Sequence, residues 1–222
     1  MKKIFLFLCM CLGVLVVQAQ DMKSLFIALP DSLSPLLTKV NREDFGDFLA
    51  SNMKAEVKNR FGKPSEMTVL TDNYLKIKMS SASETEMKLL PLNDSVQVIC
   101  VVHTYMAPIA DSQLSFYNTK WEKLPNDQFL ILPDEDMFYK HDLSEIQADS
   151  LKNLCMRTDM YMLKAELSKD SDMLRFVYTT PDYLDQETKK ELLPYLSETP
   201  LCYEWKEGKF VIMKKEIASL KK

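Results

Sequence analysis

The sequence predicts an α+β protein built from antiparallel β-meanders that helices cover. Strand-like segments follow one another through residues 67–122 with short polar connections, which is typical of an antiparallel meander. Helical periodicity precedes this block and returns after it. The order of helices, strands, helix and strands suggests two similar helix-plus-meander lobes, residues 20–130 and 131–222. One continuous domain over residues 20–222 is the alternative.

The first block, residues 20–64, is predicted to be helical. A short apolar segment over residues 22–29 stops at a proline. Ser34 followed by Pro35 is typical of a capped helix start, and Asn41 with acidic residues after it is typical of another. The apolar face of this last helix is predicted to contain Phe45, Phe48, Leu49, Val57 and Phe61.

Residues 96–106 are predicted to be the central strand of the following block. This is the most hydrophobic strand-like segment after the N-terminal run, and it contains five consecutive apolar residues. A strand of this kind is expected to be covered on both faces of its sheet. The other strands of the block are predicted at residues 67–70, 74–79, 86–92 and 112–121.

The second half of the chain is predicted to repeat this organisation. Residues 123–157 form a connector that contains a helix beginning near Ser144. Two hairpins follow, with a helix over residues 181–193 between them, and Gly208 supplies a positive φ in the second turn. The connector helix is predicted to place Ile146, Leu151, Leu154 and Cys155 on one face, and the strands are predicted at residues 160–167, 173–179, 201–205 and 209–213.

Residues 1–19 are predicted to be a signal peptide. Lys2 and Lys3 precede an uncharged apolar run over residues 4–17, and cleavage is expected after Ala19. A run of about 14 residues is shorter than the roughly 20 that span a bilayer as a helix, and no later stretch is long enough. We therefore expect a periplasmic or secreted protein without a permanent membrane span. An uncleaved anchor and a lipoprotein are the alternatives.

The composition argues against several classes of function. The formal net charge is −4, and it becomes −6 when the two lysines of the N-terminal segment are removed. The chain therefore has no electrostatic drive toward phosphate backbones, and no nucleic-acid partner is expected. Only 4 glycines are present, and no Gly-rich nucleotide-binding motif occurs. GxSxG and HExxH are absent as well, and we expect no cofactor.

Three cysteines follow the predicted cleavage site: Cys100, Cys155 and Cys202. At most one pair of them can form a disulfide, and free buried thiols are the favoured state. Cys100 and His103 are three residues apart on one predicted strand. Because side chains alternate along a strand, these two point to opposite faces and cannot form a catalytic thiolate–imidazole pair.

The acidic residues near His141 have the chemistry of ligands for a hard cation. Asp134, Asp136 and Asp142 supply oxygen atoms, but their spacing does not suit calcium and no glycine turn is present. A solvated acidic loop is the favoured interpretation, and the same holds for the turn at residues 168–172. We therefore predict no catalytic, cofactor-binding or metal-ligating residue, although the paired carboxylates of a glycosidase would leave no motif.

Three Asp-Ser-apolar tripeptides resemble the acceptor sequence of general O-glycosylation in Bacteroides-type bacteria. Their serines are Ser32, Ser95 and Ser150. Ser95 lies in a predicted turn and is the favoured position for such a modification. For Ser32 and Ser150, helix capping is the alternative role.

Residues 30–37 (PDSLSPLL) with residues 41–45 (NREDF) form one distinctive segment, and residues 108–117 (PIADSQLSFY) followed by Trp121 form another. Together they resemble an uncharacterised family of exported proteins from Bacteroides-type Gram-negative bacteria that carries a domain of unknown function. Residues 105–107 depart from the pattern, since members often have Cys-Gly before this proline. The resemblance covers nearly the whole mature chain and implies a location and a class, but no functional residue.

Predicted export without a recognisable catalytic motif favours a non-enzymatic binding or accessory module of the cell envelope. Its partner is expected to be an unknown envelope protein or a glycan. One alternative is a glycan or peptide hydrolase with paired carboxylates, which would lie buried in a cleft. Another is a structural subunit of an envelope complex, which predicts a large exposed apolar patch.

Overall fold

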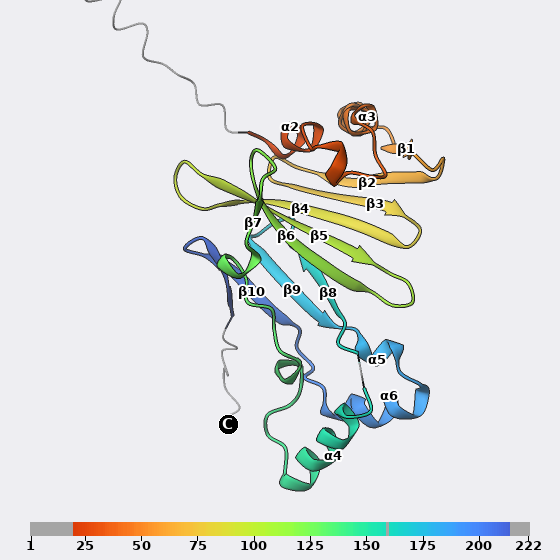
Figure 1. Ribbon diagram of the computed structural model, residues 1–222, viewed down its shortest axis with the longest axis vertical. Helices are drawn as coiled ribbons and strands as arrows, with labels where there is room; N and C mark the ends of the chain where they lie inside the picture. Colours follow the sequence, from red (N-terminus) through yellow and green to blue (C-terminus); the bar gives the residue numbers. More distant parts are fainter. Residues whose placement is uncertain (1–19, 159, 214–222) are drawn as a thin grey trace, which may run out of the picture.

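Two antiparallel sheets form the body of the protein (Figure 1). The computed structural model describes residues 20–158 and 160–213. The strands of the larger sheet lie side by side in the order in which they follow along the chain. They are β1 (Glu56–Lys58), β2 (Pro64–Leu70), β3 (Tyr74–Ser80), β4 (Ser83–Pro91), β5 (Gln97–Tyr105), β6 (Asp111–Asn118) and β7 (Lys123–Leu124). Those of the smaller sheet are β8 (Leu163–Leu167), β9 (Met173–Tyr178), β10 (Leu201–Lys206) and β11 (Lys209–Ile212). The order in the smaller sheet is β11-β10-β9-β8, and the predicted α+β class is confirmed.

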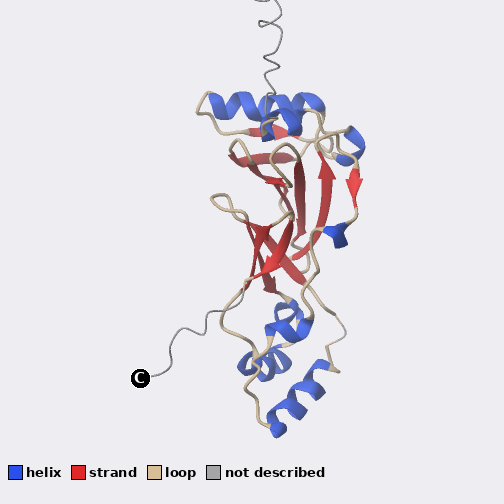
Figure 2. Ribbon diagram, turned by 90° about the vertical axis from the view of Figure 1, so that its left-hand side faces the viewer, coloured by secondary structure: helices blue, strands red, loops and turns tan. Residues whose placement is uncertain are grey.

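Helices lie at both ends of the molecule, with the two sheets between them (Figure 2). At one end are α2 (Met22–Ile27) and α3 (Lys39–Ala50), and at the other are α4 (Glu145–Cys155), α5 (Thr180–Tyr183) and α6 (Gln186–Leu192). Short 3-10 turns are η1 (Asp31–Leu33), η2 (Asn126–Gln128), η3 (Glu135–Phe138) and η4 (Leu193–Tyr195). Within the described ranges, no helix is long and apolar enough to cross a membrane.

The first apolar core, called here the helix-side core, lies between α2, α3 and one face of the larger sheet. Leu25 and Phe45 from the helices pack in one cluster with Ile77 and Ile99 from the sheet. Trp121, in the turn between β6 and β7, belongs to the same cluster, and its Nε1 donates to the Leu25 carbonyl at 3.0 Å. The helices are thus attached to the sheet by both apolar burial and a buried hydrogen bond.

The second apolar core, called here the inter-sheet core, lies between the other face of the larger sheet and the smaller sheet. Cys100 and Phe116 from the larger sheet cluster with Leu174, Phe176 and Trp205 from the smaller one. The rings of Phe116 and Trp205 stack with centroids 6.4 Å apart. Both sheets therefore share this core, and the boundary between lobes after residue 130 stays a prediction.

β5 is a central strand covered on both faces, as predicted. It lies between β4 and β6. Val98, Cys100 and Val102 belong to the inter-sheet core, whereas Ile99 and Val101 belong to the helix-side core. Burial of both faces explains why this strand is continuously apolar instead of alternating.

Side chains of the larger sheet cap the edge of the smaller sheet at β8. Three alternate backbone N–H groups of β8 point away from β9 toward these side chains. The acceptors are Asp111 Oδ1, Ser112 Oγ and Glu86 Oε2, at 3.1, 2.9 and 2.7 Å from the nitrogens of Leu163, Ala165 and Leu167. These bonds satisfy the donors of an edge strand and fix its position on the larger sheet.

A buried lysine fixes the turn that follows β8. Lys88 is only 2% exposed, and its Nζ donates to the carbonyls of Ser168 and Lys169, each at 3.2 Å. Asp172 Oδ1 lies 3.5 Å from the same nitrogen. A buried ammonium group is tolerated when it has such partners, and here they join the two sheets.

The start of α3 differs from the prediction. Thr38 caps this helix: its hydroxyl accepts from the Asn41 N–H, and the Asn41 side chain accepts from the Thr38 N–H, both at 3.1 Å. Asn41 is therefore the third helical residue of a capping box and not the cap. Ser34 does not open a helix either, because it follows η1 and is buried.

The predicted continuation of this helix to Val57 and Phe61 is wrong. The helix ends at Ala50, and Asn52 adopts a left-handed backbone with φ 53°. Val57 belongs to β1, where it is a buried residue between two exposed charged ones. A single apolar position between charges fits a strand at the edge of a sheet as well as it fits a helix. Because the turn at Asn52 ends the helix, Val57 lies in a strand.

Two predictions for the second half also need correction. Ile146 in α4 is 81% exposed instead of buried, whereas Leu154 on the same helix is buried. The helix predicted over residues 181–193 is interrupted at Leu184, which has an extended backbone. Asp185 then caps α6 by accepting from the N–H groups of the second and third helical residues. The cap starts a new helix and therefore separates it from α5.

Candidate functional site

A strap, defined as residues 126–137, leads from β7 toward the helices at the far end and lies beside β11. Its position is fixed by buried side chains. The Phe210 N–H donates to the Phe129 carbonyl at 2.7 Å, and the rings of Phe129 and Trp205 stack with centroids 6.1 Å apart. Phe129 and Leu130 thus anchor the strap in the inter-sheet core.

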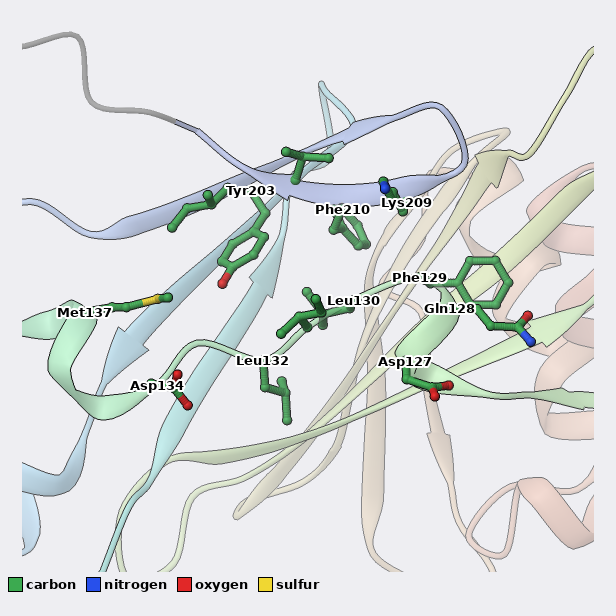
Figure 3. Close-up of a pocket in the computed structure, with 13 residues that line it drawn as sticks. Asp127, Gln128, Phe129, Leu130, Leu132, Asp134, Met137, Tyr203, Lys209 and Phe210 are labelled. Carbon is green, nitrogen blue, oxygen red and sulfur yellow. The ribbon is translucent and has the colours of Figure 1, made fainter.

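Grooves open on both sides of the strap. One, of 460 Å³, lies between the strap and β11 (Figure 3). The other, of 740 Å³, lies between the strap and the beginning of β6. Leu130, Ile131 and Leu132 line both grooves. We call the two together the strap grooves.

The rim of the first groove exposes a group of aliphatic side chains. The exposed fractions are 80% for Ile131, 55% for Leu132, 40% for Met137, and 38% each for Val211 and Ile212. Figure 3 shows Leu130, Leu132 and Met137 on the strap side, opposite Tyr203 and Phe210 of the smaller sheet. Apolar side chains gathered at one place on a surface are typical of binding sites, whereas single exposed ones are common everywhere.

Few polar groups line the first groove. They are Asp127, Gln128, Asp134, Lys209 and the Tyr203 hydroxyl. Burial raises the pKa of Tyr203, and the negative charge of Asp134 raises it further. The hydroxyl therefore stays protonated near neutral pH and can donate a hydrogen bond. An apolar surface with a few orienting polar groups fits binding.

Glu84 and Glu86 are two buried carboxylates close to each other on β4. The Lys76 ammonium donates to both, at 3.2 and 2.7 Å. Glu86 also caps the Leu167 N–H of β8. Neither carboxylate lines a strap groove. The sequence does not reveal this pair, because alternating charged residues on a strand normally indicate a solvent-facing side.

A second polar network joins the smaller sheet to the helical end. Glu135 Oε1 accepts from the hydroxyls of Tyr139 and Tyr178, at 2.7 and 2.5 Å. The Cys155 thiol donates to the Tyr139 hydroxyl at 3.5 Å. Burial raises the pKa of Tyr139, Tyr178 and Cys155. All three groups are therefore neutral near pH 7, so Cys155 is not an activated nucleophile.

Cys100 and His103 lie on opposite faces of β5, as predicted. Cys100 is in the inter-sheet core, where burial raises the pKa of its thiol. On the other face, His103 Nδ1 is 2.8 Å from Thr85 Oγ1, and burial lowers its pKa. Cys100, Cys155 and Cys202 are all free.

The acidic segments do not form a cation site in the part of the chain that the structure describes. No group of three or more His, Cys, Asp or Glu side chains there is arranged to hold a metal ion. Asp134 lines the first groove, and His141 and Asp142 are exposed. Asp172, predicted to be in a solvated turn, is only partly exposed because it pairs with Lys88.

The three candidate serines have different environments. Ser95 is exposed in the turn between β4 and β5, where its N–H donates to Asn93 Oδ1. Ser32 is exposed in η1, and the Ser150 hydroxyl donates to the Ile146 carbonyl within α4. Glycosylation of Ser95 stays a prediction.

The two sheets and the strap grooves define an α+β protein with apolar grooves on its surface. The chain belongs to the DUF3256 family, which is described as a protein of unknown function and whose model matches residues 14–210. This agrees with the predicted resemblance. The chain is similar to the solved structure of a domain of an uncharacterized protein from Porphyromonas gingivalis W83, with 29% identity and a TM-score of 0.77 over 88% of this chain and 100% of that chain. No curated protein matches it.

The residues that carried the resemblance have structural roles. Asp111 and Ser112 cap β8, Phe116 lies in the inter-sheet core, and Trp121 lies in the helix-side core. Asp31 accepts from two arginine side chains. The pattern thus describes how the layers are held together.

The sequence analysis did not identify the strap grooves, although one signal was present. Residues 129–132 are four consecutive apolar residues within a connector bounded by Pro125 and Pro133. Such a run in a loop either anchors the loop to a core or forms an exposed patch. Here Phe129 and Leu130 anchor the loop to the core, and Ile131 and Leu132 form the exposed patch.

Proposed function

We propose that this chain is an exported, non-enzymatic binding module of the cell envelope that holds an apolar segment of a partner protein in the strap grooves. The observation that carries this proposal is the group of exposed aliphatic side chains beside Ile131 and Leu132. Covering these side chains removes apolar surface from water, which is the main driving force of protein association.

The lining of the grooves favours a protein partner over a glycan. The exposed rim is aliphatic, with Ile131, Leu132, Val211 and Ile212. Polar groups are few, whereas a glycan needs many hydrogen-bond partners for its hydroxyls. β11 is also an edge strand beside the groove, so a partner strand can lie along the part of it beyond Phe210, whose N–H already donates to the strap.

The exported location rests on the predicted signal peptide. Residues 1–19 lie outside the described residues, so cleavage after Ala19 and residence in the periplasm or outside the cell are part of this proposal. Mass spectrometry of the protein recovered from cells will test it. An N-terminus at Gln20 is expected, and a chain that keeps the first 19 residues would contradict it.

A double variant, Ile131→Ser with Leu132→Ser, tests the binding proposal. Both side chains are more than half exposed, so the fold should be retained. Capture from an envelope extract should identify a partner that the wild type enriches, and the purified partner should bind the double variant about tenfold or more weakly.

Ile146→Ser on α4 is the matched control, since Ile146 is 81% exposed and lines neither strap groove. Equal binding by the wild type and the double variant would contradict the proposal. A partner that stays at fixed stoichiometry through purification would indicate the structural-subunit alternative.

The hydrolase alternative is favoured by one observation, the buried pair Glu84 and Glu86. Their bonds to Lys76 and to the Leu167 N–H give them a structural role without any reaction. Assays with peptide and glycan substrates, using Glu84→Gln and Glu86→Gln, will distinguish the hydrolase alternative from a purely structural role. Turnover by the wild type that either folded variant loses would replace the binding proposal.

A further inference from the structure

The turn between β1 and β2 holds an aromatic side chain out into solvent. Phe61 is 76% exposed, a large fraction for a phenylalanine. The next residue, Gly62, has φ 70°, and no atom lies within 4 Å of the place where a Cβ would be. Phe61 is therefore at a protruding tip and not over a partly filled pocket.

This turn is held in place by a buried side chain. Asn59 is 6% exposed, and its Oδ1 accepts from the N–H groups of Phe61 and Lys63, at 3.0 and 3.2 Å. Its Nδ2 donates to Ser65 Oγ at 3.1 Å. The exposure of Phe61 is thus imposed by a well-bonded backbone, so the ring is presented at little further cost in conformational entropy.

Basic residues flank Phe61 in the sequence. Lys58, Arg60 and Lys63 lie within three residues of Phe61, on a chain whose formal net charge is −4. Arg60 pairs with Asp31. Neither lysine forms an ion pair with another described residue. Lys58 and Lys63 therefore leave two positive charges without an ion-pair partner in the described ranges, at this turn of an acidic protein.

The first turn of α3 extends this surface. The Asn41 side chain donates to the Lys58 carbonyl at 3.4 Å, and the Arg60 N–H donates to the Leu36 carbonyl at 2.9 Å. Val40, next to Asn41, is 61% exposed. The surface lies at the β1 edge of the larger sheet, whereas the strap follows the opposite edge at β7 (Figure 1).

We propose that this tip docks on an anionic phospholipid surface. Phe61 enters the interfacial layer, and Lys58 and Lys63 face the headgroups. An apolar group and several cations together give reversible membrane attachment, which neither gives alone. A nucleic acid is disfavoured because a single ring provides no platform on which successive bases can stack.

Vesicle sedimentation tests this proposal with the chain that starts at residue 20, which keeps every described residue and lacks the apolar N-terminal run. The wild type should bind vesicles of phosphatidylglycerol and phosphatidylcholine but not vesicles of phosphatidylcholine alone. Phe61→Ser should weaken binding roughly tenfold, and Lys58→Ser with Lys63→Ser should weaken it and reduce its salt sensitivity.

Ile146→Ser is the matched control, because Ile146 is 81% exposed next to Glu145 on α4 and lies outside both the tip and the strap grooves. It should bind vesicles as the wild type does, and circular dichroism should show that every variant is folded. No binding by the wild type, or binding that folded Phe61→Ser retains in full, would overturn the proposal. Equal binding to a soluble polyanion, independent of Phe61, would overturn it as well.

Discussion

At the residue scale, the least expected feature is the number of charged side chains buried between the layers. Lys88, Glu86 and Arg42 are each no more than 3% exposed, and each binds backbone groups of a neighbouring segment. Such groups add specificity because they have partners only when the segments are correctly placed. They also predict where single substitutions will be costly.

Lys88→Ala should lower the free energy of unfolding by about 3 kcal/mol, because it leaves two carbonyls and Asp172 without their cation. Urea denaturation will measure this value. Lys152→Ala, at an exposed position of α4, is the control and should change stability by less than about 0.5 kcal/mol. A similar small effect at Lys88 would show that these contacts contribute little.

His103 should make stability depend on pH. Burial lowers its pKa below the ordinary 6.5, so the unfolded chain takes up a proton more readily than the folded one. Stability from this residue is therefore present above pH 6.5 and is lost as the pH falls through the lowered pKa. His103→Gln should reduce the slope of unfolding free energy against pH below 6.5. An unchanged slope would exclude His103 as its source.

At the element scale, Thr38→Ala should destabilise the protein by about 1 kcal/mol, because it removes the cap of α3. Thermal unfolding will measure the loss. Ser34→Ala is the informative comparison, since the sequence pattern alone makes Ser34 a cap. If Ser34→Ala lost the stability expected for a lost cap and Thr38→Ala lost none, the assignment of Thr38 as the cap of α3 would be contradicted.

The strands and the start of α4 at Ser144 could be predicted from the sequence, whereas the start of α3 and the candidate site could not. Alternation along a strand is local, so β3, β5 and β9 appear close to their predicted positions. The start of α3 depends on tertiary contacts, because buried Arg42 donates to the carbonyls of Leu29 and Leu37. The strap grooves exist only because β11, distant in sequence, lies beside the strap.

At the scale of the whole molecule, the shared inter-sheet core predicts that both sheets unfold together. The two tryptophans report on different parts: Trp121 on the helix-side core and Trp205 on the inter-sheet core. Trp121→Phe and Trp205→Phe each leave one fluorophore. Their urea transitions, corrected for the stability change of each variant, should agree with the transition seen by circular dichroism. Separate midpoints would instead favour two lobes that unfold independently.

The capping of β8 also limits how copies of this protein can associate. Side chains of Asp111, Ser112 and Glu86 occupy the N–H groups along that margin. At the other margin the strap accepts from the Phe210 N–H of β11, so the smaller sheet accepts another backbone only along the remainder of β11. Templated fibre growth requires two available margins on every subunit. Copies joined through this sheet should therefore stop at a pair, which protects the folded protein from polymerisation by this route at high local concentration.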